Sequence, residues 1–338
     1  MNQDYKTPVD IPDGDEPLNA CGKTHRGLKR SDNQDQFLIA RLSKSIWIDD
    51  TSLEIETRRQ YGRTFGEVLL VADGMGGHAG GRRASEVAIV HLISKLLSAV
   101  HTHFHGKLEE DLLIKDLQAM LQDTHARILT EAARNAEIRG MGTTVTMAYI
   151  VWPTMYVVHA GDSRCYLIGD DGTKQITTDH TLARQMVESG GLKPEEEATS
   201  RWSNVLWNVL GGSNDGDIIA EVHKVDLQAR DTVVLCSDGL HRYLDQGRLS
   251  KLLDAHPETR EACESLIQLA LDSGGEDNVT AIVYRSPGES GERATWIEDF
   301  DGQISSTMID SEPTEDDFHL PETDPELNLR ETDPEGLL

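Results

Sequence analysis

The sequence is short of positive charge. It has 32 Lys and Arg against 59 Asp and Glu, and its formal net charge is −27. Nucleic-acid backbones and anionic lipid headgroups attract basic surfaces, so this deficit argues against a nucleic-acid-binding protein and against docking on an anionic membrane. Long apolar runs are also missing. No stretch of about twenty apolar residues occurs, so no membrane span is expected.

Cysteine is scarce, and a secretory signal is lacking. The N-terminal residues have neither the basic start nor the apolar core of such a signal. The cysteines form no CxxC pair and no zinc-binding spacing; they are Cys21, Cys165, Cys236 and Cys263. We therefore expect a cytoplasmic protein with reduced cysteines.

The acidic excess is concentrated toward the ends of the chain. Residues 286–338 hold sixteen Asp or Glu against two Arg, which is about half of the net charge. Residues 1–19 and 287–338 cannot bury enough apolar surface to offset chain entropy, and we predict that both acidic segments are disordered. Residues 20–286 are then the folded domain.

The C-terminal segment places threonines among acids, as at Thr314, Thr323 and Thr332. Phosphorylated threonines could be read by a forkhead-associated domain or a similar phosphopeptide-reading partner. The alternative is an inert, solvated tail.

Apolar patterning predicts a mixed fold. Helical spacing is found over 80–100, 110–136, 246–255 and 259–273; in the first of these Val87, Val90, Ile93 and Leu97 recur at this spacing. Short apolar or β-branched runs predict strands at 37–40, 67–72, 143–151, 154–160, 232–236 and 279–284, with a hairpin over 164–177. Strands and helices come in groups, which favours an α+β or sheet-sandwich fold over regular βαβ alternation.

Isolated acids recur at the ends of the predicted strands, mostly beside glycine. They are Asp35, Asp73, Asp162, Asp238 and Asp277. Each alone could be a turn former. Five together can converge at one edge of a sheet assembly, where they would raise each other's pKa.

Hard divalent cations such as Mn²⁺ or Mg²⁺ resolve such repulsion, because they prefer carboxylate, carbonyl and water oxygens. Two such ions about 3.5–4 Å apart can hold one hydroxide and orient it for in-line attack on phosphorus. The residues thus predict a metal-dependent phosphate chemistry.

At this point the chain resembles a known family, the metal-dependent protein phosphatases of type 2C (PPM), in their bacterial serine/threonine phosphatase branch. The likeness covers about residues 20–285. It is carried by an ordered set of segments: Arg30-Ser31-Asp32-Asn33-Gln34-Asp35, Asp73-Gly74-Met75-Gly76-Gly77-His78, Gly142-Thr143-Thr144, Gly161-Asp162-Ser163-Arg164, Thr178-Asp179-His180, Ser237-Asp238-Gly239-Leu240 and Glu276-Asp277-Asn278-Val279-Thr280.

The resemblance implies an α+β fold, a sandwich of two antiparallel β-sheets flanked by α-helices, with a dimetal site. By this likeness Asp73 bridges two metals and the Gly74 carbonyl ligates one of them. Asp238 and Asp277 complete the other, and Asp162 with Asp238 matches a third, weaker position. Arg30 matches the arginine that holds the substrate phosphate, for which its planar fork is suited.

One position departs from the family, which usually has glutamate where this chain has Gln34. Glutamine can hydrogen-bond water but supplies no charge, so altered metal affinity is expected rather than lost catalysis. Asp35 beside it is kept and is assigned to the metal site and to catalysis. His78 is a candidate general acid for the leaving serine or threonine oxygen, with shaping of the turn as the alternative.

Two other features leave alternatives open. His101, His103 and His105 alternate near a predicted helix end, where they form either a metal site or a solvated helix terminus. The segment 179–212 corresponds to the family's variable flap. Its Trp202 and Trp207 either contact substrate or pack the flap onto the body.

The leading hypothesis is a Mn²⁺- or Mg²⁺-dependent serine/threonine protein phosphatase, in which a dimetal-bound hydroxide attacks phosphorus directly. Its partners would be phosphorylated proteins, namely a Ser/Thr kinase and its substrates. One rival is a pseudophosphatase that only binds phosphoproteins. Another is a hydrolase of small phosphate esters that shares the same site.

Overall fold

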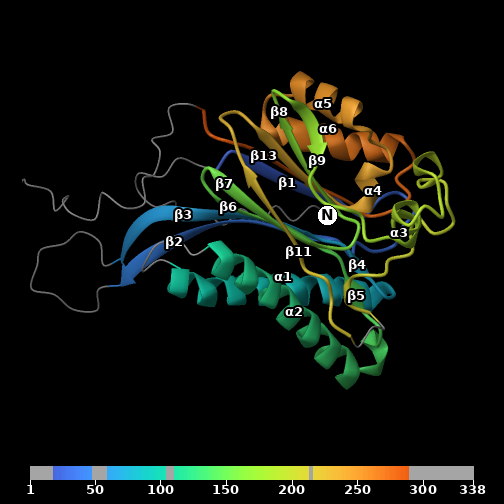
Figure 1. Cartoon of the computed structure of the whole chain (residues 1–338), viewed down its shortest axis with the longest axis horizontal. Helices are drawn as coiled ribbons and strands as arrows, with labels where there is room; N and C mark the ends of the chain where they lie inside the picture. Colours follow the sequence, from blue (N-terminus) through green and yellow to red (C-terminus); the bar gives the residue numbers. More distant parts are fainter. Residues whose placement is uncertain (1–17, 48–58, 104–109, 213–215, 289–338) are drawn as a thin grey trace, which may run out of the picture. The chain divides into compact units, whose positions relative to one another are not determined.

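The computed structural model describes residues 18–47, 59–103, 110–212 and 216–288. Two five-stranded sheets lie face to face at its centre, and helices cover both outer faces (Figure 1). The two acidic segments, 1–19 and 287–338, fall almost wholly outside the described residues, so their predicted disorder stays a prediction.

Both large sheets are antiparallel throughout. Sheet A runs in the order β1 (Ala20–His25), β13 (Val279–Arg285), β12 (Thr232–Cys236), β8 (Arg164–Gly169) and β9 (Gly172–Gln175). Sheet B runs in the order β11 (Glu221–Asp226), β7 (Thr154–Ala160), β6 (Val145–Val151), β3 (Arg59–Ala72) and β2 (Gln36–Trp47). A small third sheet joins β10 (Leu210–Gly211), β5 (Gly142–Thr143) and β4 (Gly74–Met75).

The helices form two outer layers. α1 (His78–His103) and α2 (Glu110–Arg134) pack on sheet B, and α5 (Gln246–Ala255) and α6 (Thr259–Asp272) pack on sheet A (Figure 1). The shorter helical elements are η1 (Ala136–Ile138), α3 (Leu182–Glu188), η2 (Pro194–Glu196) and α4 (Asp238–His241).

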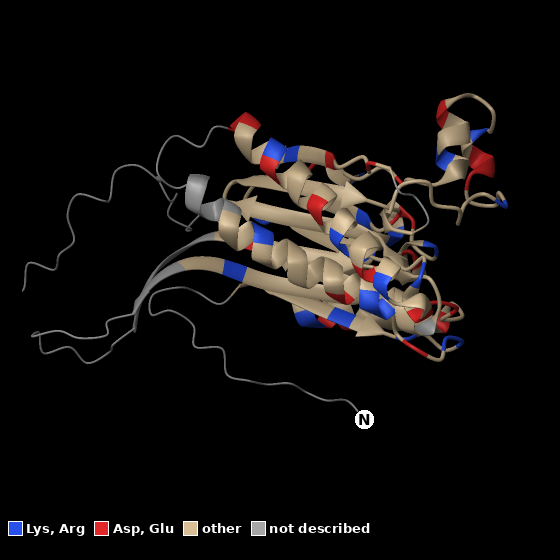
Figure 2. Cartoon of the chain, turned by 90° about the horizontal axis from the view of Figure 1, so that it is seen from below, with Lys and Arg blue, Asp and Glu red and all other residues tan. Residues whose placement is uncertain are grey.

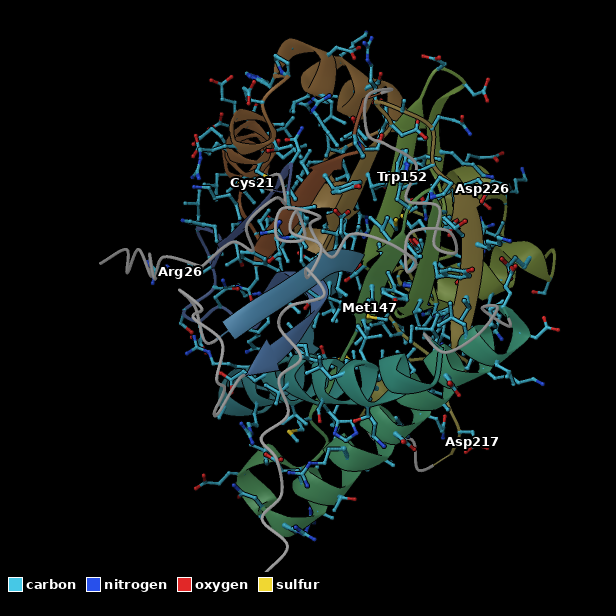
Figure 3. The ribbon with its side chains drawn as sticks, turned by 90° about the vertical axis from the view of Figure 1, so that its left-hand side faces the viewer. Cys21, Arg26, Met147, Trp152, Asp217 and Asp226 are labelled. Carbon is cyan, nitrogen blue, oxygen red and sulfur yellow. The ribbon has the colours of Figure 1, made fainter. Side chains whose placement is uncertain are left out.

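The strand sequences read as continuous apolar runs because both faces of each sheet are buried. In β3, Val68 and Leu70 face the helices, whereas Leu69 and Val71 face the other sheet. Alternate side chains of the strand thus pack into two different cores. Each fully buried aliphatic side chain contributes about 1.5–3 kcal/mol to the free energy of folding. Met147 of β6 lies between sheet B and its helices (Figure 3).

Charged residues are kept out of these cores. In Figure 2 Lys, Arg, Asp and Glu sit mostly on helices and loops, whereas the strands are largely without charge. Among the described residues, no helix combines the length and apolarity that crossing a membrane would require.

The predicted helices and central strands are confirmed, with three corrections. The core face of α1 was misjudged: Val87 is buried, but Val90 and Leu97 are 68% and 59% exposed. Ala84, Ala88 and Leu92 provide the core contacts instead, because two apolar stripes are present and only one meets the sheet.

The second strand of the predicted 164–177 hairpin, expected at Gln175–Thr177, is Gly172–Gln175 instead, because Gly169 pairs directly with Gly172 across a two-residue turn. The edge strands β1 and β11 were not predicted. Their sequences, ACGKTH and EVHKVD, hold too few apolar residues to predict a strand. They form strands because their backbones hydrogen-bond to β13 and β7.

Candidate active site

The five aspartates come from both sheets and meet at one end of the sandwich. Asp35 precedes β2, Asp73 lies between β3 and β4, and Asp162 lies between β7 and β8. Asp238 begins α4 directly after β12, and Asp277 precedes β13. All except Asp35 line one pocket of about 390 Å³, together with Arg30, Gln34 and Gly74.

Asp35 lies beneath the pocket and is 1% exposed. Its Oδ2 accepts hydrogen bonds from Ser237 Oγ and Thr280 Oγ1, both at 2.7 Å. No donor among the described residues reaches its buried Oδ1. A buried carboxylate oxygen without a donor is costly, and it is the first sign that the site is built for a further positive group.

The electrostatics of the cluster give the second sign. Burial and the charges of Asp35 and Asp238 raise the pKa of Asp73 well above its usual value. Burial and Asp238 do the same for Asp162, and burial raises the pKa of Asp238. Burial also raises the pKa of Asp35 to about 6, although its hydroxyl donors oppose the rise.

These carboxylates therefore repel one another when ionised, and protons or cations must relieve the repulsion. The groups that could bind a metal ion all offer hard oxygen atoms, and one of these atoms, Asp35 Oδ1, accepts no hydrogen bond from the described residues. The residues fit two Mn²⁺ or Mg²⁺ ions.

Backbone contacts fix Asp73 rigidly. Its N–H donates to Thr144 Oγ1 at 3.0 Å, and its carbonyl accepts from the Thr144 N–H at 2.8 Å and from Thr143 Oγ1 at 2.9 Å. Thr144 Oγ1 also lies 2.8 Å from Ser163 Oγ. The Gly142–Thr144 and Gly161–Arg164 segments thus hold the central carboxylate in place.

The turn after Asp73 requires glycine. A Cβ on Gly74 would clash with the carbonyl oxygen of Gly81 and would lie 2.8 Å from that of Gln34. Gln34 is anchored through its backbone, since its N–H donates to Asn278 Oδ1 at 2.8 Å and its carbonyl accepts from Ser85 Oγ at 2.7 Å. Its side chain is left to line the pocket.

Two arginines stand at the pocket, each paired with an aspartate. Arg30 Nη2 donates to Asp277 Oδ2 at 2.7 Å, and the Arg30 side chain is 58% exposed. Arg242 donates to Asp238 Oδ2. Sequence reasoning named Arg30 and missed Arg242, and nothing near Arg242 in the sequence marks it.

The side chains of the candidate histidines fall outside the described part of the structure. His78 is the first residue of α1, but its side chain lies outside the described part, so its role as general acid stays a prediction. His101 and His103 end α1 and their side chains are likewise not described; His105 lies in a segment that is not described.

In the flap, Trp207 packs against His180 at 5.1 Å between ring centroids, and the Arg201 guanidinium lies 4.6 Å from the Trp202 ring. Both contacts lie within the flap, so the two alternatives for Trp202 and Trp207 stay predictions. Asn204 and Leu206 are the flap residues that line the pocket.

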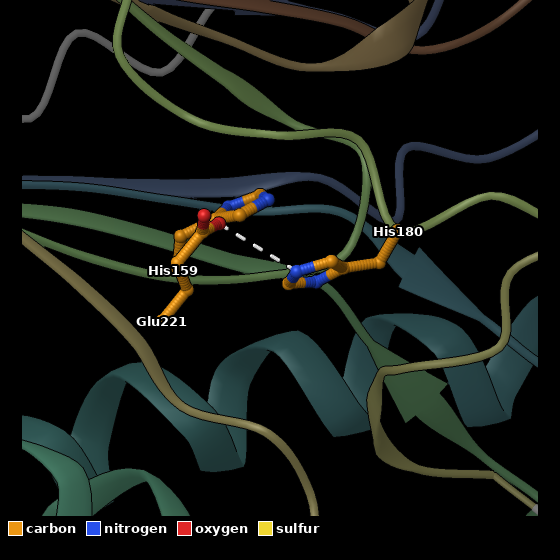
Figure 4. Close-up of side chains that lie close together, drawn as sticks. All are labelled: His159, His180 and Glu221. Carbon is orange, nitrogen blue, oxygen red and sulfur yellow. Dashed lines mark ion pairs between the residues drawn. The ribbon is translucent and has the colours of Figure 1, made fainter. Parts of the chain in front are cut away.

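A second polar cluster consists of His159, His180 and Glu221 (Figure 4). Its spacing would suit a metal ion, but its ring nitrogens are engaged. His159 Nε2 donates to the Thr178 carbonyl at 3.1 Å. His180 Nδ1 accepts from the Gly161 N–H at 3.1 Å, which puts its proton on Nε2, facing Glu221 at 3.6 Å. The cluster is a buried hydrogen-bond network that joins β7 and β11 to the start of the flap.

This network predicts an acid-sensitive component of stability. Burial, followed by the charge of His180, lowers the pKa of His159 to about 4. An unfolded histidine titrates near 6.5, so the unfolded state binds the proton first as the pH falls. The stabilisation by neutral His159 should be complete above about pH 6.5 and be lost toward pH 4, by up to about 3 kcal/mol.

Urea unfolding of the wild type and His159→Gln at pH 8, 6.5 and 5 measures this. The stability gap between them should narrow as the pH falls. His256→Gln, at the end of α5, is the matched control, and a gap for His159→Gln that stays constant with pH would contradict the assignment.

Carboxylates that need cations, beside an arginine that can take a phosphate, are typical of one class of protein, the metal-dependent phosphohydrolases. A family model described as protein phosphatase 2C matches residues 60–272. The serine/threonine phosphatase Stp of Listeria innocua is 31% identical over 216 residues, which make up 64% of this chain and 83% of that protein. The chain belongs to the protein phosphatase 2C family.

Solved structures agree. The serine/threonine phosphatase PstP/Ppp of Mycobacterium tuberculosis matches with a TM-score of 0.63 and 29% identity, over 80% of this chain and 99% of its own. The catalytic domain of PstP in complex with two manganese ions matches with a TM-score of 0.60 and 28% identity, over 80% and 98%. The predicted family and the α+β sandwich fold are confirmed, and the protein is a metal-dependent protein phosphatase.

Proposed function

We propose that this enzyme hydrolyses phosphoserine and phosphothreonine in proteins, with two Mn²⁺ or Mg²⁺ ions held by the aspartate cluster. The observation that carries the proposal is the convergence of Asp73, Asp162, Asp238, Asp277 and Arg30 at one pocket, with the charge of buried Asp35 acting on Asp73. Relatives named serine/threonine phosphatases support the choice of substrate.

The proposed ligands are Asp73, Asp238, Asp277 and the Gly74 carbonyl, with Asp35 behind them. When bound, the two ions would lower the pKa of a water toward neutrality and offset the charge that develops on the phosphate oxygens. Asp162 with Asp238 matches the family's third, weaker position, and whether this chain binds an ion there is considered below together with the neighbouring Arg242.

The chain's own residues do the rest. Arg30 can exchange Asp277 for the substrate phosphate, since its fork offers two parallel N–H donors. Thr143 Oγ1 donates to the backbone carbonyl of Asp73 and fixes the main chain that carries its carboxylate. The hydroxyls of Ser237 and Thr280 donate to Asp35 Oδ2 and hold that carboxylate in position. Asp35 Oδ1 is buried and accepts no hydrogen bond from the described residues, so it remains available to a cation held by the cluster.

The test is a set of matched phosphothreonine, phosphoserine and phosphotyrosine peptides together with p-nitrophenyl phosphate, each assayed with Mn²⁺. Phosphothreonine and phosphoserine peptides should turn over. Turnover of p-nitrophenyl phosphate alone would favour a hydrolase of small esters. Peptide binding without turnover would favour a pseudophosphatase.

The proposal extends to partners and location. Its substrates would be proteins phosphorylated by a Ser/Thr kinase, in a bacterial signalling pathway in the cytoplasm. All four cysteines are free in the structure, which suits that compartment. The proposed tail-reading partner involves residues outside the described part, and capture of such a partner before and after deletion of residues 288–338 would test it.

A further inference from the structure

The short helix α4 holds the Arg242 side chain against Asp238. Arg242 caps α4, four residues after Asp238. Residues at this spacing lie on the same side of a helix, and the Arg242 guanidinium donates to Asp238 Oδ2. The two side chains are 29% and 15% exposed, so the pair is largely shielded from bulk water.

The guanidinium stands where two cavities meet. A second cavity of about 730 Å³ lies under the flap, and Asp162, Asp238 and Arg242 line both cavities. Asp162 is 7% exposed. Burial and Asp238 raise its pKa, and the positive charge of Arg242 opposes that rise. Arg242 in turn interacts with Asp238, Asp277 and Asp162, three of the five clustered acids.

Asp162 and Asp238 are also the pair that resemblance assigns to a third, weaker metal. A cation there would have to displace a hydrogen-bonded guanidinium from Asp238 Oδ2 and would meet its positive charge at short range. The other oxygen of Asp238 is not used by Arg242, so the dimetal site keeps its ligand.

We propose that Arg242 takes the place of the third cation, so that this chain binds two divalent ions and neutralises Asp162 and Asp238 with its own guanidinium. The inference rests on the proposed dimetal function and concerns how its charge is balanced. An arginine is always charged, so this part of the site does not depend on the supply of metal.

Metal stoichiometry tests the inference without reference to activity. Equilibrium dialysis against rising Mn²⁺, followed by metal analysis, should give two ions per wild-type chain. Arg242→Ala should bind a third ion at Mn²⁺ concentrations above those that saturate the first two. Arg242→Asp, which adds a carboxylate, should bind it more tightly.

Two variants act as controls. Arg242→Lys keeps the charge and should stay at two ions, so that lost packing alone does not explain a third. Arg184→Ala removes an arginine that lines the same second cavity but pairs with Glu188 and Glu197, and it should also stay at two.

Three ions in the wild type, or two in both Arg242→Ala and Arg242→Asp, would overturn the inference and leave the proposed function standing. No bound ion in any variant would overturn both. Two ions in Arg242→Ala with a raised KM for phosphopeptide would assign Arg242 to substrate binding instead.

Discussion

Asp73→Asn should abolish turnover and yet make the metal-free protein more stable. Asp73 is repelled by the other four aspartates of the cluster. Its burial raises its pKa, and so do the charges of Asp35, Asp238, Asp162 and Asp277. At neutral pH an ionised Asp73 therefore costs folding free energy unless a cation is present. The amide has the same shape without the charge.

The expected loss in kcat is about a thousandfold or more, the equivalent of roughly 4 kcal/mol of charge stabilisation. The melting temperature measured in EDTA should rise, whereas the rise that Mn²⁺ gives the wild type should shrink. Asp226→Asn, at the exposed end of β11, is a matched control that should change neither. Wild-type kcat in Asp73→Asn, or a lower melting temperature in EDTA, would contradict this account.

Arg164→Met should destabilise the fold by about 3–5 kcal/mol, the usual cost of leaving a buried charge unpaired. Arg164 donates two hydrogen bonds to Asp179, from Nε to Oδ1 at 2.9 Å and from Nη2 to Oδ2 at 2.6 Å. Its Nη1 donates to Tyr166 Oη at 3.0 Å. Burial alone would raise the pKa of Asp179, but the pair lowers it, so the carboxylate is ionised inside the protein. The pair joins β8 to the segment that leads into the flap.

Urea unfolding in EDTA measures the effect. The double variant Arg164→Met/Asp179→Leu should recover most of the loss, because neither charge is then left alone. Arg184→Ala, which breaks more exposed pairs with Glu188 and Glu197, should cost less than about 1 kcal/mol. A loss below 1 kcal/mol in Arg164→Met would contradict the predicted cost of leaving the buried Asp179 carboxylate unpaired.

The sequence was informative where chemistry is local. Asp73 and Asp238 follow apolar strands and precede glycine, and a strand end beside glycine is a position that a sheet sandwich brings to its edge. The order of the segments then indicated the family. The apolar runs of β3, β6, β12 and β13 were recognisable because both of their faces are buried.

It was uninformative where a partner comes from elsewhere in the chain. Arg164 meets Asp179, and Asn278 supports Gln34, through tertiary contacts that no spacing encodes. Arg242 lies only four residues from Asp238, but a helix of four residues gives no periodic signal. The exposure of Val90 depends on which of two apolar stripes of α1 meets the sheet.

Catalysis by two bound ions makes the rate of this enzyme depend on metal. Hydrolysis of a phosphothreonine peptide is measured after EDTA treatment and again as Mn²⁺ is added back, with bound metal counted in parallel. We expect no turnover in EDTA and a rate that rises to its plateau as two ions bind. Full turnover in EDTA, or none with any divalent ion, would contradict this expectation.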